Sequence, residues 1–179
     1  MLRPSVLLLA SAITLALSGC KPAPTPATDG GAASTSATAA DTQQADAKFA
    51  DLSKRWLDGW LALSPVSATQ IGDHRFDAQL DDYSEAGRTK GLQFSKQMLA
   101  ELEAIDAKSL SRENQVDASV LRNQLRYDIW GSETLQSWAW DPLIYNSVAG
   151  GSLYSLVARE FAPWPERLNN ATARMEKVP

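Results

Sequence analysis

Histidine and cysteine are nearly absent from this chain, whose 179 residues include one of each, His74 and Cys20. A catalytic zinc site commonly takes three protein ligands, two or three of them imidazoles, and an HExxH motif needs two histidines. A single cysteine leaves no intramolecular disulfide and no CxxC motif. The chain therefore predicts no metal site, no cofactor and no catalytic set made from its own residues.

An excess of basic charge is also lacking. The sequence has 17 Lys and Arg residues against 21 Asp and Glu, which gives a net charge of −4 and a pI near 5.0. A nucleic-acid partner would require a basic stripe, so we expect none. Glycines are not arranged for phosphate binding either, because Gly150-Gly151 lacks the spacing of the known phosphate loops. What remains is an ordinary globular composition, 44% hydrophobic and 21% charged.

Residues 1–19 are predicted to be a signal peptide. Arg3 supplies the positive charge, and the apolar run that ends at Leu17 is too short to span a bilayer as a helix. The following Leu17-Ser18-Gly19-Cys20 resembles the bacterial lipobox, in which the cysteine receives a diacylglycerol and becomes an acylated N-terminus. The alternative is an ordinary signal peptide with a cysteine there by chance. We predict lipid attachment at Cys20.

Acyl chains on Cys20 would anchor the protein to a membrane, because each buried CH₂ contributes about 0.8 kcal/mol. Lys21 stands where an aspartate would resemble the inner-membrane retention signal of enteric bacteria. We therefore expect a protein of the bacterial cell envelope, lipid-anchored in the outer membrane and facing the periplasm. Residues 20–45 are rich in Ala, Thr, Ser, Pro and Gly and carry no large apolar side chain, which predicts a disordered linker.

Residues 46–179 are predicted to form an all-α domain, an irregular array of helices. In the first helix the apolar residues recur every three or four positions, as one helix face requires: Phe49, Leu52, Trp56, Trp60 and Leu63. Similar patterns and caps predict helices over 46–63, 84–107 and 112–130, a short one from Ser152 and a last one after Pro163. Gly131 is expected to end the third helix. Residues 138–142 are expected to be extended, and Gly150-Gly151 is expected to form a hinge-like break before the short helix from Ser152.

The last predicted helix places four apolar side chains on one face, Trp164, Leu168, Ala171 and Met175. The chain then stops at Pro179 without a partner for this stripe. Such an end is more typical of a truncated domain than of a natural C-terminus. We expect the domain to be incomplete.

Two tryptophan pairs allow either a ligand site or ordinary packing. Trp56 and Trp60, one turn apart, are able to form an aromatic platform, but their place on the apolar stripe favours core packing. Trp138 and Trp140 are able to line a sugar or peptide groove, and packing is again the alternative.

The only histidine lies in the stretch Ser64–Asp77, where Gly72 offers a left-handed helix stop. One interpretation is a turn in which carboxylates pair with Arg75 and cap amides. In the other, His74, Arg75 and Asp77 line a cleft and orient an anionic group of a substrate. A Ser-His-Asp triad is not favoured, because there is no GxSxG elbow and sequence neighbours rarely orient one another as a triad does.

Four stretches together resemble a known family. They are residues 63–77 (LSPVSATQIGDHRFD), 114–118 (NQVDA), 121–125 (LRNQL) and 140–143 (WDPL). They are similar to the bacterial family named domain of unknown function 885, and the resemblance covers about 48–179. Many members of that family look like lipoproteins, which agrees with Cys20.

The resemblance implies a larger, mostly helical protein similar to zinc metallopeptidases, with an HExxH-type helix downstream of the region matched here. This chain would then be the N-terminal, cleft-forming part of an envelope-anchored zinc-dependent peptidase or related hydrolase acting on peptides. The missing C-terminal region would hold the zinc and the general base, since no family ligand has a counterpart here. The alternative is a stand-alone helical lipoprotein that binds a peptide or protein partner.

Overall fold

The computed structural model describes residues 38–178, and these begin with a capping box. The backbone N–H of Asp41 donates to Thr38 Oγ1 at 3.2 Å, and the backbone N–H of Thr38 donates to the Asp41 carboxylate at 3.2 Å. This reciprocal cap starts helix α1, Ala39–Leu63, so the helix begins at Ala39 and not at Asp46. Residues 39–45 are thus helical, contrary to the predicted linker, whereas the predicted signal peptide and Cys20 lie outside the described residues.

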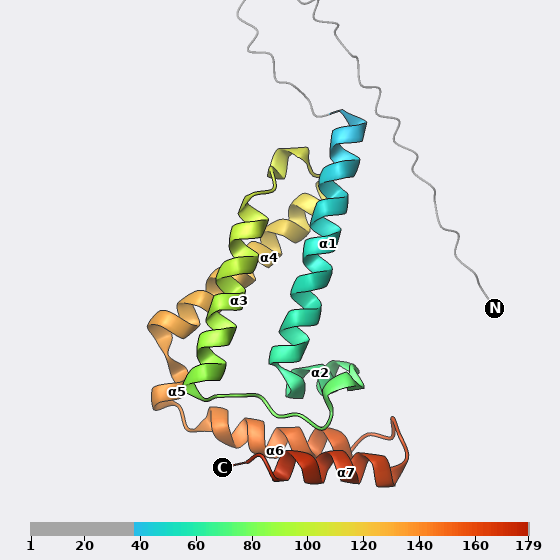
Figure 1. Ribbon diagram of the computed structural model, residues 1–179, viewed down its shortest axis with the longest axis vertical. Helices are drawn as coiled ribbons and strands as arrows, with labels where there is room; N and C mark the ends of the chain where they lie inside the picture. Colours follow the sequence, from blue (N-terminus) through green and yellow to red (C-terminus); the bar gives the residue numbers. More distant parts are fainter. Residues whose placement is uncertain (1–37, 179) are drawn as a thin grey trace, which may run out of the picture. The chain divides into compact units, whose positions relative to one another are not determined.

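The remaining helices follow in the order shown in Figure 1. They are α2 (Pro65–Ile71), α3 (Glu85–Glu103), α4 (Arg112–Trp130), α5 (Ser137–Trp140), α6 (Leu143–Val157) and α7 (Trp164–Met175), with two 3₁₀ turns, η1 (His74–Phe76) and η2 (Ala107–Ser109). The described residues contain no strand, so the predicted all-α class is confirmed. Among these helices none is long and apolar enough to cross a membrane.

Helices α1, α3 and α4 lie alongside one another and bury a continuous apolar core (Figure 1). Its buried members are Ala45, Phe49, Leu52, Met98, Leu102, Leu110, Ala118, Leu121 and Leu125. Phe49 and Leu52 belong to the predicted apolar stripe of the first helix, and further apolar side chains, Trp56, Leu99 and Ile105, pack half-buried against the core. Hydrophobic burial of this kind is the main favourable term in folding.

A second layer crosses the end of the bundle where α1 finishes (Figure 1). Helices α6 and α7 pack side by side, and α2 packs on α6. Gly72 ends α2 with φ +94°, which confirms the predicted left-handed stop.

Helix α4 ends at Trp130, as predicted, although Gly131 stays right-handed (φ −61°) and a π-helical turn follows, Gly131–Leu135, that ends at left-handed Gln136. Two further local predictions, between residues 137 and 152, are wrong. Residues 137–140 form the short helix α5 instead of an extended piece. Helix α6 passes through Gly150-Gly151 without a break, because packing on α7 and α2 outweighs the low helix propensity of glycine.

Candidate functional site

A cavity of about 690 Å³ lies where the bundle meets the second layer. Its walls come from the end of α1, the start of α2, residues 79–83, the first half of α3, the end of α4 and the segment up to Ile144. The volume falls within the range of about 300–1,000 Å³ that is usual for small-molecule sites. This cavity is the candidate functional site.

Aromatic side chains form much of the wall: Trp60, Tyr83, Phe94, Tyr127 and Trp138. Trp60 stacks on Trp56 with ring centroids 6.2 Å apart, so the predicted pair supplies both core packing and a cavity wall. Trp138 lines the cavity, whereas its predicted companion Trp140 is exposed and donates from Nε1 to Leu135 O at 2.9 Å. One tryptophan of each pair therefore reaches the cavity.

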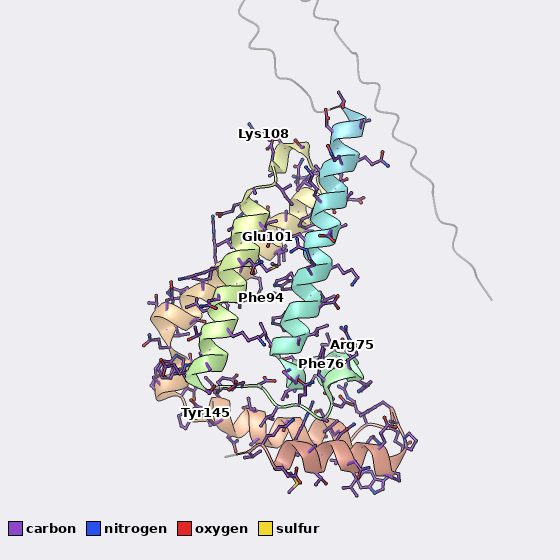
Figure 2. The ribbon with its side chains drawn as sticks, viewed as in Figure 1. Arg75, Phe76, Phe94, Glu101, Lys108 and Tyr145 are labelled. Carbon is purple, nitrogen blue, oxygen red and sulfur yellow. The ribbon has the colours of Figure 1, made fainter. Side chains whose placement is uncertain are left out.

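The position of Phe94 depends on a glycine. Phe94 extends from α3 toward α1 (Figure 2) and packs against Gly59, where an added Cβ would overlap its ring. The absence of a side chain at Gly59 therefore allows α1 and α3 to approach closely beside the cavity.

Two aspartates that line the cavity are partly buried, and each accepts one hydrogen bond. Asp81 accepts from the backbone N–H of Val66 at 2.9 Å, and Asp128 accepts from Gln124 Nε2 at 2.8 Å. Burial raises the pKa of Asp81, although the hydrogen bond from Val66 and the charge of Arg174 oppose it. Burial likewise raises the pKa of Asp128, opposed by the hydrogen bond from Gln124.

Asp81 also stabilises the start of helix α2. Ser64, which stands at the cap position of α2, makes no side-chain capping bond, and the N–H of Val66 in the first turn donates to Asp81 instead. The first turn of α2 is thus stabilised by a residue fifteen positions later in the chain.

The basic residues of the cavity wall are partly engaged. Arg88 donates from Nη1 to Tyr83 O at 2.6 Å, and its guanidinium lies 3.7 Å from the Trp138 ring centroid. Lys90 is exposed at the rim. Four lining carboxylates (Asp81, Asp82, Glu85 and Asp128) face two lining cations, Arg88 and Lys90, so the formal balance is −4 + 2 = −2. The cavity is acidic and aromatic.

His74 and Asp77, two of the predicted site residues, contact each other beside α2. His74 Nδ1 lies 2.9 Å from Asp77 Oδ2, and the imidazole stacks on Phe161 with ring centroids 3.7 Å apart. Asp77 is only 4% exposed, and Thr69 Oγ1 donates to its second oxygen at 2.6 Å. The pair joins the Ser64–Asp77 stretch to the segment before α7.

Arg174 of α7 completes this buried polar network. It is fully buried and donates to Gln79 O (2.8 Å), Ser152 O (2.8 Å), Pro65 O (3.2 Å) and Thr69 Oγ1 (2.6 Å). Burial lowers the pKa of Arg174, and the carboxylates of Asp77 and Asp81 oppose this. Sequence reasoning missed Arg174. Its available signal was the two-turn spacing from Arg167, which is also buried.

Arg75 lies apart from this network. Its Nη2 pairs with Asp73 at 2.6 Å and with Asp58 of α1 at 3.1 Å, and the side chain is half-exposed beside the end of α1 (Figure 2). The Asp73 carboxylate also accepts from the N–H of Arg75 at 3.1 Å, as the turn interpretation predicts. His74, Arg75 and Asp77 are not among the residues that line the 690 Å³ cavity. Their role in a cleft of a longer protein stays a prediction.

The residues described do not fit a zinc centre. Within 38–178 no three His, Cys, Asp or Glu side chains are grouped to hold a metal ion, and His74, the single histidine of the sequence, is engaged with Asp77 and Phe161. Zinc in proteins prefers imidazole and thiolate ligands, which the aromatic and carboxylate cavity does not offer.

The fold and the cavity define a helical unit with one concave acidic and aromatic site. The chain belongs to a family of bacterial proteins of unknown function (DUF885), whose pattern matches residues 65–179. The family resemblance predicted from residues 63–77 and the later stretches is thereby confirmed.

A solved structure is similar over most of the chain. It is that of "a putative lipoprotein of unknown function" from Shewanella oneidensis, with 38% sequence identity and a TM-score of 0.67. The match covers 72% of this chain and 23% of the chain from Shewanella oneidensis. The present chain therefore corresponds to less than a quarter of the length of that protein. Comparison with curated proteins finds no match.

Proposed function

We propose that this chain is the N-terminal, cleft-forming part of a larger hydrolase of the bacterial cell envelope, acting on peptides. The observation that carries the proposal is the match to 23% of a longer chain at 38% identity. In this proposal the present helices wall a substrate cleft, and zinc and the general base come from other residues of the whole protein. The reaction class rests only on the resemblance given in the sequence analysis, which implies a protein similar to zinc metallopeptidases.

The surface of α7 supports a further part of the protein packed against it. This helix buries Arg167 and Arg174 and turns its apolar side chains outward, with Trp164 50%, Leu168 46% and Met175 59% exposed. Large exposed apolar surfaces usually mark interaction sites. The predicted unpartnered stripe is thus exposed except at Ala171.

Envelope location is part of the proposal. The similar structure from Shewanella oneidensis belongs to a protein described as a lipoprotein, and the lipobox-like sequence ends in Cys20. A diacylglycerol on Cys20 would hold the protein on the outer membrane, facing the periplasm. Replacing Cys20 by serine tests this, because the variant should move from the membrane fraction to the soluble fraction.

The decisive experiment is the intact mass of the native, membrane-extracted protein together with its zinc content. We expect a mass several times the 19.4 kDa of this chain and about one zinc ion per polypeptide. A mass near 19.4 kDa, after allowance for signal removal and lipid, without zinc, would contradict the hydrolase proposal.

The second candidate function is that of a stand-alone helical lipoprotein that binds a peptide or protein partner. It is favoured by the cavity of about 690 Å³, whose aromatic and carboxylate lining suits a bound side chain of a partner. Under this proposal the 19.4 kDa protein unfolds in urea in one cooperative transition. Under the first proposal the same polypeptide, studied alone, is loosely packed and aggregates through the face of α7.

A further inference from the structure

We propose that the 690 Å³ cavity binds a small organic cation, a primary amine carried on an aromatic or aliphatic body. The inference concerns this chain alone and does not depend on the hydrolase proposal. It assigns a ligand class to a site that lies away from His74, Arg75 and Asp77.

The walls suit the apolar body of such a ligand. Trp60, Phe94 and Trp138 present aromatic surface from three different helices, and Leu63 and Leu92 add aliphatic surface. Small-molecule sites typically combine walls of this kind with a few polar groups that fix the orientation of the ligand. A ligand without an apolar part would leave this surface in contact with water.

The two half-buried aspartates suit the ammonium group. Each carboxylate receives one hydrogen bond, from Val66 or from Gln124, at one oxygen only. No other hydrogen bond from a residue in 38–178 reaches either carboxylate. A protonated amine carries three N–H donors and is able to engage the second oxygen of either carboxylate. Hydrogen bonds between charged groups are roughly twice as strong as neutral ones.

The basic side chains do not make the cavity an anion site. The Arg88 guanidinium lies against the Trp138 ring and donates to a backbone carbonyl, while Lys90 is exposed to solvent. The formal charge of the side chains that line the cavity is negative. Aromatic ring faces also attract cations. An inorganic cation is less suited, because it would find no third grouped ligand among the described residues.

The test compares two probes that share one body. 2-Phenylethylamine and 2-phenylethanol are titrated calorimetrically, at neutral pH, into the detergent-extracted native protein. The amine is protonated at this pH, so we expect saturable binding with one site per chain and at least about tenfold weaker binding of the alcohol. Equal affinity for both probes, or no binding of the amine at millimolar concentration, overturns the proposal.

Matched variants locate the site. Asp81→Asn and Asp128→Asn each remove a negative charge but keep the oxygen that accepts the existing hydrogen bond. Each should weaken amine binding by about tenfold or more. Asp117→Asn, on the exposed side of the same helix as Asp128, is the control and should leave the affinity unchanged. Unchanged affinity in both cavity variants, with melting temperatures at or above the native value, overturns the assignment.

Discussion

The bundle of α1, α3 and α4 and the layer of α2, α6 and α7 are stabilised in different ways. The bundle buries aliphatic and aromatic side chains in one apolar cluster. The layer buries polar and charged side chains among a few apolar ones: Thr69, Asp77, Ser152, Ser155, Arg167 and Arg174. Hydrophobic contact is non-directional, whereas each buried hydrogen bond demands a particular geometry. The bundle should therefore tolerate substitutions that change the shape of a buried side chain, whereas the layer should not.

The direction of α7 illustrates the difference. Arg167 donates to the carbonyls of Leu156, Val157 and Arg159 at the end of α6, so an arginine closes that helix terminus. Arg174 instead links α2 to α6, because it donates to Pro65 O and to Ser152 O. Because these two residues occupy the inner face, the apolar residues of α7 lie on the outer one.

The largest effect is expected from breaking the layer at its centre. Arg174→Met removes the hydrogen bonds that the guanidinium donates to Thr69, Ser152 and Gln79, and it leaves the buried Asp77 carboxylate without the nearby positive charge of Arg174. We expect a loss of about 3–5 kcal/mol of unfolding free energy, measured by urea denaturation. Arg112→Met, at an exposed position, is the control and should change it by less than about 0.5 kcal/mol. A loss below that of an exposed site would contradict the network.

The bundle is tested at Leu125, which is fully buried on α4. Leu125→Ala should lose about 3 kcal/mol, because it removes buried methyl groups and leaves a void. Leu125→Met should lose less than about 1.5 kcal/mol, since Met fills a similar volume. The corresponding conservative change in the layer, Arg174→Lys, should cost nearly as much as Arg174→Met. If Leu125→Met and Arg174→Lys lowered the unfolding free energy equally, the proposed difference between the bundle and the layer would be refuted.

A smaller effect is expected where α1 meets α3. Gly59→Ala should lose about 1–3 kcal/mol, because the added Cβ overlaps the Phe94 ring and the helices must shift. Gly91→Ala, on α3, meets no atom within 4 Å and should instead gain about 0.5–1 kcal/mol from helix propensity. Thermal unfolding of both variants measures the difference, and the same sign for both would refute the close contact.

The smallest effect is a pH dependence at Asp81, which joins the two regions. Burial raises the pKa of this carboxyl in the folded state, so the protonated form favours folding. This stabilisation is fully present below the pKa of the unfolded chain and is lost as the pH rises through the folded pKa. Asp81→Asn should remove the dependence, so that the stability advantage of the variant grows as the pH rises from 4 toward 7. Urea denaturation at several pH values measures it, and an advantage that shrinks would contradict the burial argument.

The bundle was largely predictable from the sequence. The third helix was predicted over 112–130, where α4 lies, because Ser111 caps it and the apolar spacing is local. The capping box at Thr38 was readable in principle, yet the surrounding Ala, Thr and Gln residues resemble a linker by composition. Apolar periodicity carries most of its information within one helix, and the bundle is built from such helices.

The second layer and the cavity were not predictable in the same way. On α7 the apolar stripe was predicted to lack a partner, and Leu168 and Met175 are indeed exposed, but no sequence pattern predicted that buried hydrogen bonds place Arg174 on the inner face. The cavity assembles Trp60, Asp81 and Asp128, which lie far apart in the sequence and share no periodic pattern. Only the fold brings such residues together.

The hydrogen bond from Val66 to Asp81 can be followed by NMR spectroscopy. The amide of Val66 donates to the same Asp81 carboxylate that lines the cavity. Any ligand that draws charge from that carboxylate weakens or reorients this bond, so the chemical shift and the hydrogen-exchange rate of this one amide follow occupancy of the cavity. The same resonance reports fraying of the first turn of α2. A single ¹⁵N label at Val66 thus monitors the junction between the two regions in solution.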